Sequence, residues 1–151
     1  MMLLPRAARA ALLAVLDVAL HARGRPVSSK ELAARHALPP RRLEGLLQAL
    51  VHAGVLKSLR GPSGGYELAK ERRRLTLADI LRVALRVDEE EGVLEPKIAP
   101  ASLEAAIAPA LQEIEAELFQ RLEMVTLDDL YARALVGGFG GGERAQADFE
   151  I

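Results

Sequence analysis

The sequence predicts a mainly α-helical fold with one small β-hairpin, and three observations support this class. Apolar residues make up 50% of the chain but aromatic residues only 3%, so the core must consist of Leu, Ala, Val and Ile, which suits helices. Most segments repeat these residues at steps of three and four, as one face of a helix does. A single glycine-rich stretch, RGPSGGY at positions 60–66, separates two short strand-like runs.

The length of the chain limits its domain organisation. The 151 residues suffice for one domain with a sizeable core and an accessory element. We expect that domain at residues 1–87, followed by an acidic loop at 88–100, dimerisation helices at 101–136 and a disordered, glycine-rich tail at 137–151.

Two absences narrow the functional classes. The chain has no cysteine, which excludes disulfides, cysteine nucleophiles and thiolate-bound metal clusters. The apolar start of the chain is similar to a secretory signal, but Asp17 interrupts it, and we expect an amphipathic helix that turns Asp17 toward water. No stretch has the 18 or so apolar residues needed to span a bilayer, so we expect a cytoplasmic protein without a membrane partner.

Charge divides the chain into two halves. Residues 1–75 hold 14 Lys and Arg against 5 Asp and Glu, whereas residues 76–151 hold 6 against 16. A basic half suits a polyanion, because each phosphate contact releases counterions. The alternative is a chance clustering of solvated charges.

Local signals predict three helices in the first third of the chain. The first spans residues 6–22, and its apolar face consists of Leu12, Leu13, Leu16, Ala19 and Leu20. Ser28 and Glu31 form a capping box that opens a second helix, which ends at His36. Pro40 favours the start of a third helix, and Gly54 favours its end.

The third helix has two faces of different character. Its apolar face consists of Leu43, Leu46, Leu47 and Leu50. Its other face consists of Arg41, Glu44, Gly45, Gln48 and His52. Arginine and glutamine can read base edges, and a glycine lets a helix backbone approach another molecule closely. The alternative is an ordinary solvated face.

A β-hairpin is predicted after the third helix, from residues 55–60 and 66–69. Two helices joined by a tight turn and followed by a hairpin form the outline of a winged helix. If the third helix enters the major groove, the hairpin tip lies against the neighbouring backbone or minor groove. We then expect Arg60 in the minor groove, and Tyr66 packed under the wing with its hydroxyl free to bind a phosphate.

A fourth helix is predicted from the cap formed by Thr76 and Asp79 to about Val87. Its apolar face consists of Leu77, Ile80, Leu81 and Ala84. After the acidic loop, Pro109 must either begin or kink a long helix, and Thr126 opens a further short helix.

The long helix carries the longest apolar stripe of the chain. The stripe consists of Leu103, Ile107, Leu111, Ile114, Leu118, Leu122 and Val125. Burying each of these side chains stabilises by about 1.5–3 kcal/mol, so the stripe needs a partner surface. That partner is either a second copy of the chain or the first helix of the same chain. We expect the homodimer, which would present two recognition helices to a palindromic site.

Four motifs resemble the Rrf2 family of bacterial winged-helix transcriptional regulators. They are LDVAL from Leu16, SSKELA from Ser28, RRLEGLL from Arg41 and AGVLKSLRGPSGGY from Ala53. The family includes an iron-sulfur cluster assembly regulator, a nitric-oxide-sensitive repressor and a cysteine-metabolism repressor. With the long helix that the family has after its wing, the likeness covers most of the chain.

The resemblance implies contacts to double-stranded DNA from the recognition helix and the wing. Arg9 would lie near phosphate, and Glu44 would select among bases. The residues implied in DNA binding are Arg9, Ser28, Lys30, Arg41, Arg42, Glu44, Gln48, Arg60, Gly64, Gly65 and Tyr66.

The chain also departs from the family pattern. Ala10 stands where the family commonly has a Tyr, and residues 39–42 differ from the family's usual entry to the recognition helix, so the operator sequence does not transfer. Cluster-bearing members hold three cysteines in the loop that corresponds to 88–100, and this chain has none. The side chains of the consecutive acidic residues 88–91 point in different directions, which does not suit a metal site. The spacing of His21, His36 and His52 is not that of metal ligands, and we expect these residues at the surface or at helix caps. No metal or other cofactor is therefore expected.

We interpret the chain as a homodimeric, sequence-specific DNA-binding transcriptional regulator of palindromic operators, without an iron-sulfur cluster. It has no phosphate loop, nucleophile-base pair or metal cluster, so it is not expected to be an enzyme. The alternative is a winged-helix interaction module that binds an acidic protein partner through its arginines. An unidentified protein or small-molecule effector is a further possibility; a small molecule would make the chain a repressor with its ligand between the winged helix and the long helix.

Overall fold

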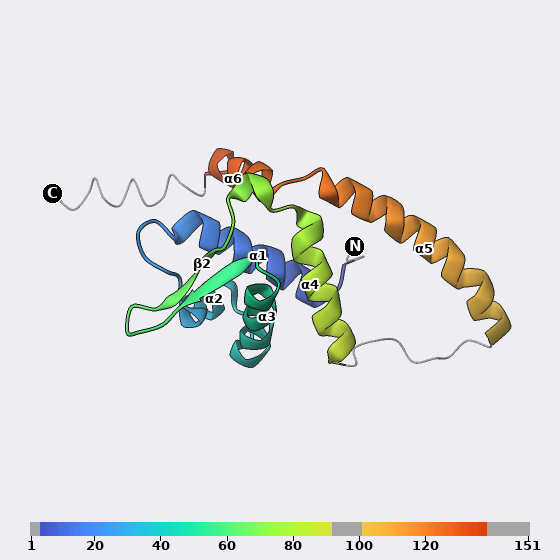
Figure 1. The fold of residues 1–151 in the computed structure, drawn as a ribbon, viewed down its shortest axis with the longest axis horizontal. Helices are drawn as coiled ribbons and strands as arrows, with labels where there is room; N and C mark the ends of the chain where they lie inside the picture. The colour runs from blue at the N-terminus through green and yellow to red at the C-terminus, as the bar shows by residue number, and fades with distance from the viewer. Residues whose placement is uncertain (1–3, 92–100, 139–151) are drawn as a thin grey trace.

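The computed structural model describes residues 4–91 and 101–138, which form a mainly α-helical fold with one antiparallel hairpin, as expected (Figure 1). The elements follow in the order α1 (Arg6–His21), α2 (Ser29–His36), α3 (Pro40–His52), β1 (Leu56–Leu59), β2 (Gly65–Leu68), the 3-10 turn η1 (Arg72–Arg74), α4 (Leu77–Glu90), α5 (Ala101–Glu123) and α6 (Leu127–Val136). The expected acidic loop lies outside the described residues from 92 to 100, and the expected tail does so from 139 onward.

The core surrounds α1, which contacts α2, α3, α4, β2 and α6. The buried apolar residues of α1 are Ala8, Ala11, Ala14, Val15 and Val18. The face expected from the sequence is wrong, because Leu12, Leu13, Leu16, Ala19 and Leu20 are only half-buried. Neighbours on several sides favour small side chains at the closest contacts, and the leucines fill the flanks of the helix.

The local signals for α2 and α3 are confirmed. The Ser28 hydroxyl accepts a hydrogen bond from the Glu31 backbone N–H at 3.2 Å, and the Glu31 carboxylate accepts one from the Ser28 backbone N–H at 2.8 Å. Pro40 is the first residue of α3, where its missing N–H has no cost. All four leucines of the expected apolar face are buried.

The wing lies where it was expected, but β1 is two residues shorter than the expected run 55–60, and β2 begins and ends one residue before the expected run 66–69. Lys57 pairs with Glu67 across the strands, and their side chains form an ion pair with an N–O distance of 3.2 Å. Val27 and Tyr66 exchange two backbone hydrogen bonds of 3.0 and 2.7 Å, which tie the hairpin to the residues before α2. This third segment compensates for the marginal stability of a two-stranded hairpin.

The helix α4 begins at the expected cap, where the Thr76 hydroxyl accepts from the Asp79 N–H at 3.2 Å. It continues to Glu90, three residues beyond the expected end. The expected loop start at residue 88 is therefore wrong, because the acidic residues 88–90 continue the helical turn instead of breaking it. Acidic side chains lower helix propensity only slightly, so charge alone does not end a helix.

The helix α6 folds back onto the winged-helix domain. Leu127 is buried in the core, and its N–H donates to the Leu75 carbonyl at 2.8 Å. The Arg72 guanidinium lies 3.6 Å above the centre of the Tyr131 ring, and Arg23 donates to the Tyr131 hydroxyl at 3.0 Å. These contacts join the end of α1, η1 and α6.

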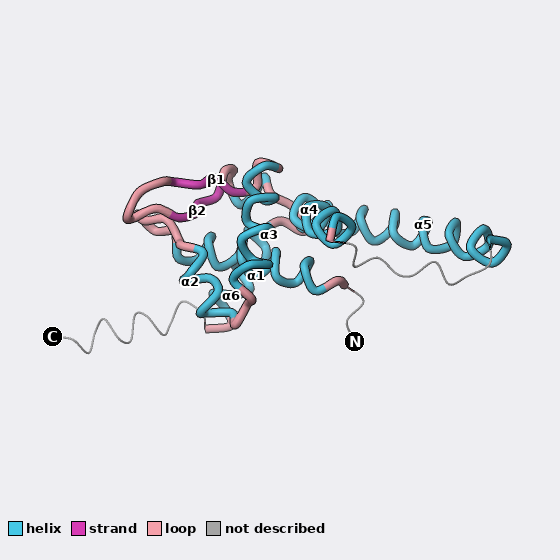
Figure 2. The backbone as a smooth tube through the Cα atoms, turned by 90° about the horizontal axis from the view of Figure 1, so that it is seen from below, coloured by secondary structure: helices cyan, strands magenta, loops and turns pink. Residues whose placement is uncertain are grey.

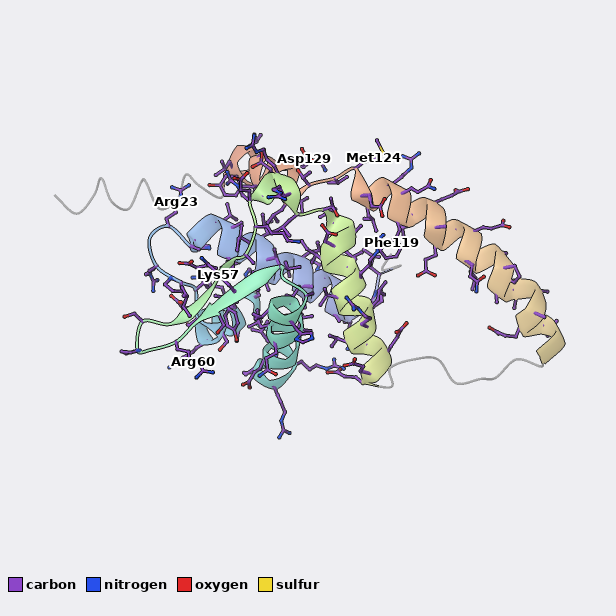
Figure 3. The ribbon with its side chains drawn as sticks, viewed as in Figure 1. Arg23, Lys57, Arg60, Phe119, Met124 and Asp129 are labelled. Carbon is purple, nitrogen blue, oxygen red and sulfur yellow. The ribbon has the colours of Figure 1, made fainter. Side chains whose placement is uncertain are left out.

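The helix α5 extends away from the other helices as an arm (Figures 1 and 2). Pro109 lies inside it. Its last turns touch the core: Phe119 points toward α4, where its ring lies 5.0 Å from the Arg82 guanidinium (Figure 3), and Leu122 packs on the buried cluster. Arg82 also pairs with Glu123 at 2.6 Å.

Candidate nucleic-acid interface

The polar face of α3 is exposed to solvent. Arg41, Glu44 and Gln48 are exposed, while the leucines on the opposite side are buried. An added Cβ at Gly45 would meet no atom within 4 Å, so nothing within the described chain requires a glycine there. The face therefore combines polar side chains with an open stretch of helix backbone.

Close packing within and beside the hairpin requires glycine at positions 64 and 65. A Cβ at Gly64 would collide with the Leu59 carbonyl oxygen, and one at Gly65 would lie 2.5 Å from the Val27 carbonyl oxygen. The backbone N–H of Gly64 donates to the Gly61 carbonyl at 2.9 Å and is therefore not free to bind a DNA phosphate. Arg60, which follows β1 directly, is an exposed cation at the tip of the wing (Figure 3).

Tyr66 connects the wing to α3. Its side chain is half-buried and packs against the core, as expected for a ring under the wing. Burial raises the pKa of its phenol, and the nearby carboxylate of Glu44 raises it further. The hydroxyl therefore stays protonated and can donate a hydrogen bond at neutral pH.

Ser28 has a structural role that the sequence also signalled. Its hydroxyl donates to the Glu31 carboxylate at 3.0 Å and accepts from the Glu31 N–H. The Ser28 backbone N–H and the guanidinium of Arg25, which lies 2.8 Å from the carboxylate, lower the pKa of Glu31 to about 2. Ser28 thus fixes the start of α2, while Lys30, two residues further along the chain, is exposed.

Arg9 and Arg42 lie apart from the Arg41 face. Both line a cavity between α1, the start of α3 and the end of α4, whereas Arg41 does not. Arg42 pairs with Glu91 across an N–O distance of 3.6 Å. Sequence reasoning placed Arg41 and Arg42 together, although successive helical residues point about 100° apart.

Sequence reasoning missed a buried polar cluster centred on Asp17, which is only 2% exposed. Its carboxylate accepts two hydrogen bonds from Arg35, at 2.9 and 2.7 Å, and lies 2.7 Å from His36 Nε2 and 3.1 Å from His21 Nδ1. The expectation of a water-facing Asp17 is wrong because these partners satisfy the buried carboxylate. The cluster fixes α2 against α1, and the available signal was an acid inside an apolar run.

Within residues 4–91 and 101–138, no three His, Asp or Glu side chains gather in a way that could hold a metal ion. No helix in these ranges is both long and apolar enough to cross a membrane.

Comparisons with known proteins agree with this geometry. A family model described as "Rrf2: Iron-dependent Transcriptional regulator" matches residues 4–133. The HTH-type transcriptional regulator CymR of Bacillus subtilis is 35% identical over 109 residues, which cover 70% of this chain and 72% of that protein. The solved structure of T. potens IscR superposes with a TM-score of 0.67 at 30% identity and covers 88% of both chains.

Some matches are shorter. IscR of Photorhabdus laumondii is 37% identical over 73 residues, which cover 48% of this chain and 44% of that protein. The chain therefore spans less than half the length of this relative.

Proposed function

The chain belongs to the Rrf2 family of DNA-binding transcriptional regulators, and on this premise we propose that it acts as a homodimer on a palindromic operator without an iron-sulfur cluster. The observation that carries the proposal is the exposed polar face of α3, which is held in place by four buried leucines. A helix presented in this way fits the major groove of B-DNA.

We assign base recognition to α3 and phosphate contacts to α1, α2 and the wing. Arg41 and Gln48 carry side chains that can bind guanine and adenine edges, and Glu44 can accept from cytosine or repel other bases. Lys30, Arg9 and Arg60 supply cations from α2, α1 and the wing. The hydroxyl of Tyr66 adds a hydrogen-bond donor.

The homodimer is supported by the apolar stripe on α5. Leu103, Ile107, Leu111, Ile114 and Leu118 are between 43% and 63% exposed. A contiguous apolar stripe of this length marks an interaction surface, and a second α5 is the simplest complement to it. Leu122 and Val125 stand closer to the core of their own chain and are half-buried there.

Regulation without an iron-sulfur cluster is supported by the residues available. The chain contains no cysteine, and a cluster of the thiolate-bound type requires several. The residues of this chain therefore do not fit a thiolate-bound iron-sulfur cluster.

The test is a comparison of two variants on DNA fragments selected from genomic DNA by the wild-type protein. Arg41→Ala should reduce discrimination between the selected site and a scrambled site by about 1–3 kcal/mol. Arg9→Ala should weaken binding to both sites alike and lower the slope of log K against log salt by about 1. Fluorescence anisotropy at several salt concentrations measures both effects.

Arg133→Ala serves as the matched control, since Arg133 is an exposed arginine on α6, remote from α3 and the wing (Figure 1). Equal losses of specific and scrambled binding for Arg41→Ala and Arg9→Ala would contradict the assignment. A wild-type protein without salt-dependent duplex binding would instead favour the module that binds an acidic protein.

A further inference from the structure

A cavity of about 530 Å³ opens between α1, the start of α3 and the end of α4. Its walls are mainly aliphatic and are formed by Ala10, Leu13, Leu38, Leu43, Leu46 and Val87. This volume lies within the range of small-molecule sites, which are lined by apolar side chains with a few polar groups. The cavity lies beside α3 and not at the junction with α5, where the sequence led us to expect an effector.

One lining residue carries a buried polar atom that has no hydrogen-bond partner within the described chain. Asp88 lines the cavity, and its Oδ2 atom is buried without a hydrogen bond within the described chain. Burial raises the pKa of Asp88, Glu91 raises it further, and Arg42 opposes them. An unsatisfied buried acceptor destabilises the protein, and a donor bound in the cavity would relieve this once the Asp88 side chain turns its carboxylate toward the cavity.

Two cations also line the cavity. Arg6 and Arg9 line the cavity from successive turns of α1, and neither has an ion-pair partner among residues 4–91 and 101–138. The other polar groups of the lining are already engaged, since His36 contacts Asp17 and Arg42 contacts Glu91. The site therefore offers one buried acceptor and two cations around an apolar interior.

We propose that this cavity binds a small zwitterion with an apolar side chain, of the class of the apolar α-amino acids. The ammonium group of the ligand donates to the carboxylate of Asp88, the ligand carboxylate faces Arg6 and Arg9, and the ligand side chain lies against the leucines of α1 and α3. A molecule that lacks either charge would leave Asp88 unpaired or the arginines without a counterion.

The cavity shares a wall with the recognition helix, because Arg42, Leu43 and Leu46 belong to α3. The bound carboxylate would also compete with DNA phosphate for Arg9. The ligand should therefore lower DNA affinity, by at least fivefold for a typical allosteric coupling. This effect on DNA rests on the proposed function, whereas ligand binding does not.

Isothermal titration calorimetry with the full chain tests binding alone. The probes are L-leucine, L-phenylalanine and L-tryptophan, together with 3-phenylpropanoate, which lacks the ammonium group, and 2-phenylethylamine, which lacks the carboxylate. We expect saturable binding of at least one amino acid. For L-phenylalanine, each truncated analogue should bind at least about tenfold more weakly, since a lost charged hydrogen bond has about this effect.

Variants assign the two ends of the ligand. Asp88→Asn should weaken amino acid binding about tenfold without changing the affinity for 3-phenylpropanoate, and Arg6→Gln should weaken the carboxylates but not 2-phenylethylamine. Glu89→Gln is the matched control, because Glu89 is an exposed neighbour outside the cavity lining. Ala10→Phe, which fills the cavity from α1, should abolish binding while circular dichroism stays unchanged.

Three results would overturn the proposal. The first is a lack of saturable binding for all three amino acids up to about 10 mM, a concentration above the dissociation constants of typical cellular ligands. The second is an unchanged affinity in Asp88→Asn. The third is retained binding in a folded Ala10→Phe protein. If the amino acid binds but duplex DNA does not, the ligand site stands and the proposed function fails.

Discussion

Replacing Gly45 with alanine is expected to move stability and DNA affinity in opposite directions. Gly45 lies in the interior of α3, on the exposed face, and a Cβ there would meet no atom within 4 Å. The new methyl group therefore has no steric cost in the free protein. It also restricts the unfolded backbone, which favours the folded state.

The magnitude follows from helix propensity. Alanine in place of glycine inside a helix stabilises by about 0.5–1 kcal/mol, which raises Tm by about 1–4 °C for a chain of this size. Against DNA the same methyl group would occupy the space between the helix backbone and the duplex. Overpacking of this kind costs about 1–3 kcal/mol, so the Kd for the selected site should rise about fivefold to 150-fold.

Gly54→Ala is the matched control, because it also replaces a glycine with alanine, at a position just after the C-terminal end of α3. Gly54 has φ of 76°, where an alanine is strained by about 1–2 kcal/mol although the space around it is open. This variant should lose stability and keep its DNA affinity. Thermal unfolding by circular dichroism and anisotropy titrations at fixed salt measure the two quantities.

The reasoning would be refuted by either of two results. If Gly45→Ala is stabilised but binds DNA as tightly as wild type, the backbone of α3 does not approach the duplex at this position. If Gly45→Ala and Gly54→Ala both lose stability, the contrast between their backbone conformations is not what decides the effect.

Three further predictions concern the other features. Ile114→Glu should convert a dimer to a monomer in sedimentation velocity without lowering helix content, because Ile114 is 63% exposed; an unchanged dimer would exclude this stretch of α5 from the interface. Asp17→Asn should reduce the free energy of unfolding in urea by about 2–4 kcal/mol, since charge-assisted bonds from Arg35 and the histidines are lost in a buried site; a change below 1 kcal/mol would speak against the cluster as the link between α1 and α2. The lowered pKa of Glu31 contributes stability that is present above its usual value of 4.5 and is lost as pH falls through about 2, so Glu31→Gln should flatten the pH dependence of stability in this window, and parallel profiles would contradict it.

Most element boundaries could be predicted from the sequence, because their signals act within three or four residues. The caps at Ser28, Thr76 and Thr126 each satisfy N–H groups of the turn that follows them. Pro40 acts through its own ring geometry, and the leucines of α3 reveal its buried face because that helix is buried on one side only.

The candidate site was predictable only in part. The exposed face of α3 followed from periodicity alone, and the structure places its side chains as expected. The pairing of Arg42 with Glu91 did not follow from periodicity, because it depends on the end of α4, about fifty residues away in the chain. The constraint on Gly64 likewise depends on the carbonyl of Leu59 across the hairpin.

The sequence by itself determined where helices and strands begin and what fold class they form, since these choices depend on neighbouring residues. Tertiary structure decided the burial of Asp17, the docking of Tyr131 beside Arg23 and the cavity beside Asp88. Asp17 and Arg35 lie 18 residues apart in the chain, and Arg23 and Tyr131 lie 108 residues apart. These interactions stabilise the protein only when packing brings those segments together and removes water from between them, so no local sequence pattern predicts them.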